Sequence, residues 1–362
     1  MDQVLISSVL SFLIVYYSVP VAILVAKKKK LFDLPDDSRK LHEAPTPSLG
    51  GVALFLGILV SISISDIIWS GSPEFSNYIA SMAILFFLGL KDDILTISAW
   101  KKLVGQLIVG GILIFKSKLL LSSMYGFLGI YELSSELSFL LTLFAIVVIV
   151  NAFNLIDGVD GLASGVAIVI ASAFGYYFFI DGQFSYAILA FSLVSALFSF
   201  LIFNFQPAKI FMGDSGSMLI GLIVAILSIR FIITSPFSAS HPIPASPALG
   251  FGFMALPLLD CLRVFFIRMT HGRSPFSPDR NHVHHLLLDR GLTHRVVTFI
   301  SILVSILFVG ISLYASTFGT TVAIFTIIAS FFLYVSILYF TRPKSTDSTL
   351  RVVEPERVRS AS

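Results

Sequence analysis

Apolar stretches of about twenty residues recur along almost the whole chain, and this feature limits the fold more than any other. A helical run of that length matches the ~30 Å hydrocarbon core of a bilayer, whereas shorter runs are typical of buried helices in soluble domains. Hydrophobic residues make up 56% of the chain and charged residues only 12%, about half the share found in soluble domains. We therefore predict an all-α polytopic integral membrane protein with about eleven transmembrane helices, at residues 3–26, 48–68, 77–90, 103–115, 137–153, 162–180, 184–203, 217–234, 249–268, 296–316 and 320–340.

The positive charges fall on one side of these spans. If the N-terminus is periplasmic, 21 of the 24 Lys and Arg residues lie in inside loops, at inside ends of spans or in the C-terminal tail. Only Lys116, Lys118 and Arg230 then remain outside. Because cytoplasmic loops carry an excess of positive charge, we predict a periplasmic N-terminus and a cytoplasmic C-terminus.

The sequence contains no sign of a second domain. We predict a single multi-span domain over residues 1–341, followed by a polar tail over 342–362 that we expect to be disordered. Lysines 27–30 follow the first apolar run instead of preceding it, so we expect that run to remain as an anchor and not to be cleaved as a signal. The single cysteine, Cys261, cannot form an internal disulfide. The net charge of +3 reflects membrane topology, and we predict no nucleic-acid partner.

Polar residues gather in five segments, all on the predicted inner side. These segments are LPDDSRKLHEAPTPSLGG (34–51), GLKDDILTISAWKK (89–102), NAFNLIDGVDG (151–161), FNFQPAKIFMGDSGS (203–217) and HGRSPFSPDRNHVHHLLLDRGLTHR (271–295). The outside loops are short and chemically plain. We therefore expect the functional site at the inner face.

Two of these segments carry acids and amides near helix ends. Asn151, Asn154 and Asp157 recur every third residue, and oxygen ligands at that spacing can converge on a hard cation or a sugar nucleotide. A carboxylate within the membrane costs about 2.5–3.5 kcal/mol on the insertion scale, which favours a functional role. Asp92 and Asp93 at a helix C-terminus also oppose the helix dipole. The plain alternative for both segments is a solvated helix end or polar loop.

The stretches around Asp214 and around three histidines add anion-binding chemistry. Asp214 in GDSGS suits a helix N-cap, and the free amides at such a helix start also form a site suited to phosphate. His282, His284 and His285 stand in a basic loop with Arg280, which favours contacts with phosphate oxygens. Zinc is an alternative for the histidines, but the hard carboxylates elsewhere favour Mg²⁺ or Mn²⁺.

These segments together predict an inner-leaflet pocket with acids, amides, an anion site and a cationic loop. Such a pocket suits a divalent metal and a phosphorylated substrate, and a lipid phosphate at headgroup level explains why it is built into a membrane protein. Spacing alone therefore predicts metal-assisted phosphoryl chemistry on a lipid phosphate. A secondary transporter is the alternative from another class. Transporters place their acids near the bilayer midplane, whereas these acids fall at the inner ends of spans.

The motifs LKDDI, NAFNLIDGVDGLASG, FMGDSGS and SPFSPDRNHVHH resemble those of the polyprenyl-phosphate N-acetylhexosamine-1-phosphate transferases. The resemblance covers almost the full length. SPFSPDRNHVHHLLL and KLLLSSMYGFLG favour the bacterial branch that transfers N-acetylglucosamine-1-phosphate to undecaprenyl phosphate. The branch that transfers phospho-MurNAc-pentapeptide tends to have three consecutive histidines instead.

The resemblance implies an enzyme of the bacterial inner membrane with its active site facing the cytoplasm. Its substrates would be UDP-GlcNAc and undecaprenyl phosphate, and its products undecaprenyl-diphospho-GlcNAc and UMP. This reaction is the first membrane step of enterobacterial common antigen and O-antigen lipopolysaccharide synthesis. Phospho-MurNAc-pentapeptide and other N-acetylhexosamine donors remain alternatives, and the family admits a homodimer.

The family's site residues carry over by motif, so their roles here are what the resemblance implies. Asn154 and Asp214 resemble the Mg²⁺ ligands, with Mn²⁺ as a substitute. The substrate-binding residues would be Asp157 and Asn204 at the nucleotide sugar, Phe211 stacked on uracil, Asp160 hydrogen-bonded to the base, Lys102 near the diphosphate, and Arg268, Arg280, His282, His284 and His285 around the sugar and phosphates.

Two points of the expected chemistry stay open. Asp92 and Asp93 are the family's catalytic acid pair, and either could be a metal ligand or the base that deprotonates the lipid phosphate. Trp100 stands where close relatives often carry lysine, so Lys101 is an alternative to Lys102. The mechanism we favour is a single displacement, and a two-step route through a phosphoryl-enzyme is the alternative.

Overall fold

The computed structural model describes residues 2–29, 46–274 and 281–341, and helices dominate these ranges. In chain order the elements are α1 (Asp2–Lys29), α2 (Gly50–Ser63), α3 (Asp66–Gly71), α4 (Phe75–Leu95), α5 (Ala99–Ser117), β1 (Ser123–Phe127), β2 (Ile130–Glu132), α6 (Ser135–Ile156), α7 (Leu162–Ile180), α8 (Phe184–Asn204), α9 (Gly213–Thr234), the 3₁₀ turn η1 (Ser235–Phe237), α10 (Ser246–Phe253), α11 (Ala255–Thr270), α12 (Val283–Leu288), α13 (His294–Ala315), the 3₁₀ turn η2 (Ser316–Phe318) and α14 (Thr320–Phe340). The predicted tail over 342–362 lies outside the described residues.

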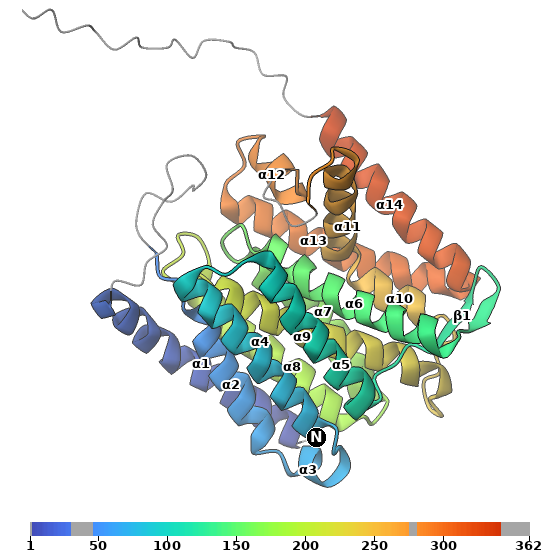
Figure 1. Cartoon of the computed structure of the whole chain (residues 1–362), viewed down its shortest axis with the longest axis horizontal. Helices are drawn as coiled ribbons and strands as arrows, with labels where there is room; N and C mark the ends of the chain where they lie inside the picture. Colours follow the sequence, from blue (N-terminus) through green and yellow to red (C-terminus); the bar gives the residue numbers. More distant parts are fainter. Residues whose placement is uncertain (1, 30–45, 275–280, 342–362) are drawn as a thin grey trace, which may run out of the picture.

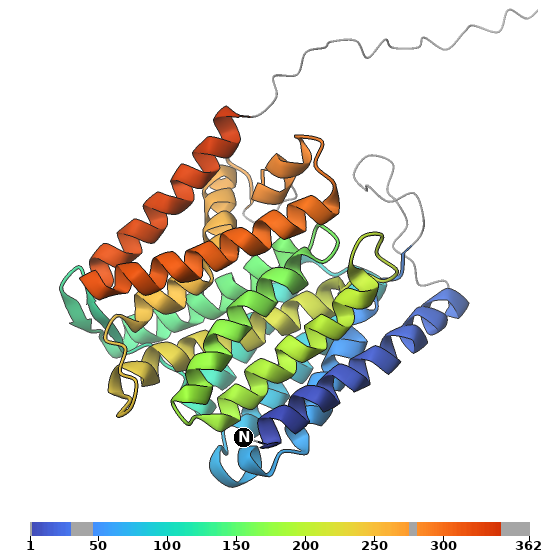
Figure 2. The same cartoon turned by 180° about the vertical axis from the view of Figure 1, so that it is seen from behind.

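The long helices lie side by side and cross the molecule from one end to the other (Figures 1 and 2). The connections α4–α5, α6–α7 and α8–α9 all fall at one end, which we call the site end. The opposite end carries α3, the β1–β2 hairpin and the turns η1 and η2. Polar segments far apart in the sequence are therefore brought to the same end of one bundle.

Seven described helices are long and apolar enough to cross a membrane, which agrees with the predicted polytopic class. The pair α10–α11 adds an eighth span if its two parts, bent by 78°, count as one. The prediction of eleven spans is not confirmed in full. Helix α2 has only 14 residues, and α4 and α5 occupy predicted positions but carry charged residues at their site ends, which lowers their hydropathy. The orientation in the membrane stays a prediction.

Helix α9 forms the centre of the bundle and packs against α2, α4, α6 and α7. Every residue from Ser215 to Ile229 is buried, as expected for a helix that is apolar on all sides. A Cβ atom on Gly221 would lie 2.7 Å from the Cα atom of Val150, so the backbones of α9 and α6 touch. Small residues allow such close packing between membrane helices. This packing sets the start of α9 beside the site ends of α4 and α6.

Candidate active site

A cavity of about 420 Å³ opens at the site end, where α4, α6 and α8 end and α9 begins. It brings together nine of the fourteen predicted site residues: Asp92, Asp93, Asn154, Asp157, Asp160, Asn204, Phe211, Asp214 and His285. Among the others, Lys102 contacts two of these residues, and Arg268, His282 and His284 form a cluster beside the cavity. Arg280 lies outside the described residues.

Asp93 of α4 holds the first turn of α9. Its carboxylate accepts hydrogen bonds from the backbone N–H of Asp214 (2.7 Å), the backbone N–H of Ser215 (3.1 Å) and the Ser215 hydroxyl (2.6 Å). A helix start leaves several N–H groups without intrahelical partners, and a carboxylate satisfies them while complementing the helix dipole. Both oxygens of Asp93 are therefore engaged in positioning Asp214.

Gly213 makes this close approach possible. Its φ of +71° lies in the left-handed region, where residues with a side chain are strained. A Cβ atom there would lie 2.5 Å from the Ser48 carbonyl oxygen and 2.6 Å from the Asp93 carboxylate. Only glycine therefore fits between the segment before α2, the end of α4 and the start of α9.

Gly213→Ala is expected to destabilise the protein by about 2 kcal/mol or more, because backbone strain adds to two atomic overlaps. The measurement is the Tm of the purified protein in detergent. Gly111→Ala is the matched control, since a Cβ at Gly111 in α5 meets no atom within 4 Å and alanine favours a helix. Equal Tm values for the two variants would contradict the packing described at Gly213.

Lys102 of α5 bridges two acids of the cavity. Its Nζ atom lies 2.6 Å from Asp92 and also donates to the Asp214 carboxylate. The other oxygen of Asp92 accepts from the backbone N–H of Ile97 at 2.6 Å. Lys101, the alternative considered from the sequence, is exposed. Lys102 is thus the lysine that reaches the acids.

Asn154 and Asp157 line the cavity from the end of α6. The Asn154 side-chain nitrogen donates to the Ser217 hydroxyl at 3.0 Å, which leaves its amide oxygen as the atom suited to a cation. Ser217 lies one helical turn after Asp214, so Asn154 and Asp214 belong to the same corner of the cavity. Removal from water, together with the negative charges of Asp214 and Asp93, raises the pKa of the Asp157 carboxyl group to about 8. A bound cation would relieve this repulsion.

This corner offers the amide oxygen of Asn154 and the carboxylate of Asp214, and the carboxylate of Asp157 lines the same cavity. Within the described residues, no group of three or more His, Cys, Asp or Glu side chains is placed to hold a metal by itself. Mg²⁺ commonly takes one or two carboxylates from a protein and its other ligands from substrate phosphates and water. The corner therefore fits a hard cation that arrives with a phosphorylated ligand.

Asp160 and Asn204 hold the loop between α6 and α7. The Asn204 side-chain oxygen accepts from the Gly161 N–H at 2.9 Å, and its nitrogen donates to the Ile210 carbonyl at 2.9 Å. Asp160 is buried; it accepts from the Ala208 N–H at 3.1 Å and lies 3.3 Å from His294 Nδ1. These contacts join the α6–α7 and α8–α9 connections into one rigid wall, next to the half-buried ring of Phe211.

The histidine cluster is positioned by a buried acid, Asp260 of α11. Its carboxylate lies 2.9 Å from His282 Nδ1 and accepts from the Val283 N–H at 3.2 Å. On the other side of the ring, Arg268 Nη2 lies 3.3 Å from His282 Nε2. The ring of His284 stacks on that of His282, with centroids 5.6 Å apart.

His284 differs from the cationic group expected from the sequence. Burial lowers the pKa of His284 to about 3, with smaller contributions from His285 and His282, so its ring is neutral at pH 7. Its Nδ1 atom is buried without a hydrogen-bond partner. The ring lies against Gly158, where a Cβ would be 3.0 Å from Nε2. His284 can therefore offer a neutral imidazole to a ligand.

Sequence reasoning missed two residues of this region: Ser217, which lines the cavity, and Asp260, which positions the histidines. His294, which belongs to the basic loop over 271–295, also lines the cavity. Asp260 could have been found from the sequence, because an acid inside the apolar stretch 249–268 is energetically costly unless it has a function. Ser217 could not have been found in this way, since serine is common at contacts between membrane helices.

Comparison with known proteins adds independent information. The family model described as glycosyl transferase family 4 matches residues 75–232. The undecaprenyl-phosphate alpha-N-acetylglucosaminyl 1-phosphate transferase of Escherichia coli is 35% identical over 318 residues, which cover 86% of this chain and 84% of the relative. The protein of that name from Salmonella typhi is 33% identical over the same coverage. The decaprenyl-phosphate N-acetylglucosaminephosphotransferase of Mycobacterium leprae is 32% identical over 323 residues, 80% of this chain and 77% of the relative.

Proposed function

Because this chain belongs to the polyprenyl-phosphate N-acetylglucosamine-1-phosphate transferases of glycosyl transferase family 4, we propose that it transfers N-acetylglucosamine-1-phosphate from UDP-GlcNAc to undecaprenyl phosphate. The products are undecaprenyl-diphospho-GlcNAc and UMP. The proposal extends to a bacterial inner membrane with the site end in the cytoplasm. It also extends to the first membrane step of enterobacterial common antigen and O-antigen synthesis.

The observation that carries the proposal is the corner formed by Asn154, Asp214 and Lys102. Asn154 and Asp214 line the same cavity, and Lys102 donates to the Asp214 carboxylate, at the end of a bundle whose helices are long enough to span a membrane. A phosphorylated nucleotide can enter from water at this end, and a lipid phosphate lies at the same depth in the bilayer. The geometry thus suits a reaction between a soluble and a lipid phosphate.

Mg²⁺ is the cofactor we propose, with Mn²⁺ as a substitute. Asn154 and Asp214 would hold it, and the remaining ligands would come from the diphosphate of UDP-GlcNAc and from water. When bound, the metal neutralises charge on the diphosphate, which is the main requirement in phosphoryl transfer. Lys102 adds a positive charge beside Asp214, and Asp92 keeps this ammonium group in place.

The proposed reaction is a single displacement at the β-phosphorus of UDP-GlcNAc. An oxygen of the lipid phosphate forms the new P–O bond, the bond from the β-phosphorus to the bridging oxygen breaks, and UMP leaves with that oxygen. A phosphate monoester has a second pKa near 6, so the attacking phosphate is mostly dianionic at pH 7. A protein base is then unnecessary. The engagement of Asp93 by the start of α9 supports this reading.

The nucleotide and sugar would occupy the rest of the cavity. Phe211 would stack its half-buried ring on uracil, and Asp160, which the Ala208 N–H and His294 contact, would accept a hydrogen bond from the base. The sugar and phosphates would lie toward His284 and His285, which the Asp260 contact to His282 keeps in position. The neutral ring of His284 can then accept or donate a hydrogen bond without a net charge.

Purified protein is expected to move label from radioactive UDP-GlcNAc onto undecaprenyl phosphate only when Mg²⁺ or Mn²⁺ is present. Chelation with EDTA should abolish transfer and added Mg²⁺ should restore it. UDP-GalNAc and UDP-MurNAc-pentapeptide serve as alternative donors, and decaprenyl phosphate as an alternative acceptor. Transfer from UDP-MurNAc-pentapeptide alone, or full transfer after chelation, would contradict the proposal. Release of UMP in the absence of any lipid acceptor would instead support the two-step route.

A further inference from the structure

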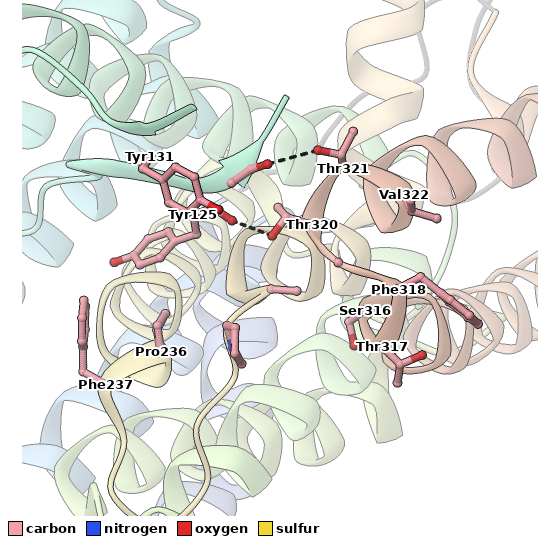
Figure 3. Close-up of a pocket in the computed structure, with 14 residues that line it drawn as sticks. Tyr125, Tyr131, Pro236, Phe237, Ser316, Thr317, Phe318, Thr320, Thr321 and Val322 are labelled. Carbon is pink, nitrogen blue, oxygen red and sulfur yellow. Dashed lines mark hydrogen bonds between the residues drawn. The ribbon is translucent and has the colours of Figure 1, made fainter. Parts of the chain in front are cut away.

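A second cavity, of about 730 Å³, lies at the opposite end of the molecule (Figure 3). The β1–β2 hairpin, the turn η1, the segment before α10, the turn η2 and the start of α14 form its walls. Figure 3 shows Tyr125 of the hairpin facing Phe237 of η1, with Thr320 of α14 on the other side. Nothing in the transfer chemistry at the site end uses this cavity.

Hydrogen bonds and a ring contact join the walls of this cavity. The Thr320 hydroxyl donates to the Tyr125 carbonyl at 2.7 Å, and the Thr321 hydroxyl donates to the Gly126 carbonyl at 3.2 Å (Figure 3). The rings of Tyr125 and Phe237 meet edge to face, with centroids 6.3 Å apart. The hairpin is therefore fixed to α14 by hydrogen bonds and to η1 by a ring contact, and the space between them has a defined shape.

The lining selects for an uncharged, largely apolar ligand. None of the described residues that line the cavity carries a charge at pH 7, and aromatic rings, prolines and small side chains make up most of the surface. A charged headgroup would lose its hydration there without gaining an ionic partner, which is costly. Phe237 is 78% exposed and Phe318 59% exposed. Tyr131 in the same lining is 66% exposed, and tyrosine is enriched at a membrane interface, so the mouth of the cavity suits a lipid chain.

The distance between the two cavities limits which lipid chain can reach from one to the other. Helix α6 runs from the hairpin to Asn154, and its 22 residues span about 33 Å at the usual rise of an α-helix. A phospholipid acyl chain fills only half of the ~30 Å hydrocarbon core. A chain of eleven isoprene units has more than twice as many main-chain carbons, so its far end can cross the whole core.

Helices α10 and α11 lie in sequence between the site end and the cavity at the opposite end. Helix α11, which carries Asp260 and Arg268, contacts α6 and α14, and α10 contacts α14 and β1. Figure 1 shows α10 and α11 between α6 and α14 on the way to the hairpin. A chain that lay along the outer surface of α11 would therefore pass α10 before it reached the cavity.

From the uncharged lining and the length of chain needed to span the bundle, we propose that the cavity at the opposite end holds the far end of the acceptor's isoprenoid chain. This inference rests on the proposed function, because it takes the acceptor to be a polyprenyl phosphate whose headgroup lies at the site end. The cavity then increases the affinity for acceptors whose chain is long enough to reach it. Acceptors too short to cross the bilayer do not contact the cavity, so it does not change their affinity.

Two substitutions test the proposal by opposite changes. Thr317→Trp fills the cavity from the exposed η2 turn, and Phe237→Ala removes an exposed wall. Each is expected to raise KM for undecaprenyl phosphate roughly tenfold, the effect of losing burial of about two methylene groups. KM for UDP-GlcNAc, and all constants with the three-isoprene acceptor farnesyl phosphate, should remain unchanged. Kinetics are measured in detergent micelles at fixed acceptor mole fraction.

Leu333→Trp and Phe198→Ala are the matched controls, because both replace exposed side chains on other parts of the surface. They should leave KM unchanged for both acceptors. The proposal is overturned if KM for undecaprenyl phosphate stays the same in both cavity variants, as it would if a phospholipid chain occupied the cavity, or if the long and short acceptors respond equally. Absence of transfer by the unmodified protein with any acceptor would instead refute the proposed function.

Discussion

Asp214→Asn is expected to lower kcat for N-acetylglucosamine-1-phosphate transfer by about 100-fold or more, with the protein still folded. The substitution keeps the shape of the side chain but removes the charge that faces Lys102 and the proposed Mg²⁺ site. Loss of one group that stabilises developing charge typically costs 100- to 1,000-fold in rate. The backbone N–H of Asp214 still donates to Asp93, so the start of α9 should keep its position.

The dependence on Mg²⁺ distinguishes a lost cation ligand from a general defect. The concentration of Mg²⁺ at half-maximal rate should rise together with the loss in kcat, because a site with lower affinity needs a higher Mg²⁺ concentration to be occupied. Asp66→Asn provides the control, since Asp66 is exposed in the first turn of α3 at the opposite end. An unchanged rate and Mg²⁺ response in the Asp214 variant would rule out a role for this carboxylate in cation binding.

Membrane class and the course of most helices could be predicted from the sequence because hydropathy is a local property. The limits of such prediction appear where tertiary contacts change the course of the chain. The 78° bend between α10 and α11 falls within one predicted span. Pro257 lies near the break, yet Pro20 lies inside the unbroken helix α1. A proline alone therefore did not reveal the bend.

Convergence of the site residues could also be anticipated, because the polar motifs end or begin consecutive antiparallel helices. The contact that each site residue makes could not be predicted. Asp92 and Asp93 are adjacent in sequence, but one pairs with Lys102 and the other with the first turn of α9. The direction of each side chain depends on how α4 packs against α5 and α9, and Gly89 permits that packing: a Cβ there would lie 2.5 Å from the Ser215 nitrogen. Such a contact has no signature in local sequence.

The two acids of the DD motif therefore call for separate tests, and Asp93→Asn is the more informative. An asparagine amide group must turn its NH₂ toward at least one of the donors from Asp214 or Ser215, which leaves that donor without a partner. Loss of an N-terminal cap costs about 0.5–2 kcal/mol, so Tm should fall. The start of α9 then shifts, and a displacement of about 1 Å at Asp214 can reduce kcat by about 100-fold.

Ser215→Ala separates a positioning role for Asp93 from a role as base. Ser215 donates its hydroxyl to Asp93 at 2.6 Å and does not line the cavity. If Asp93 positions α9, Ser215→Ala should reproduce part of both losses, and the double variant should lose less than the sum of the single variants, because both act on one contact. Ser81→Ala is the control, since the buried Ser81 hydroxyl in α4 has no hydrogen-bond partner. A base would behave differently: Asp93→Asn would lower kcat with Tm unchanged and alter the pH profile, while Ser215→Ala would remain close to the unmodified protein.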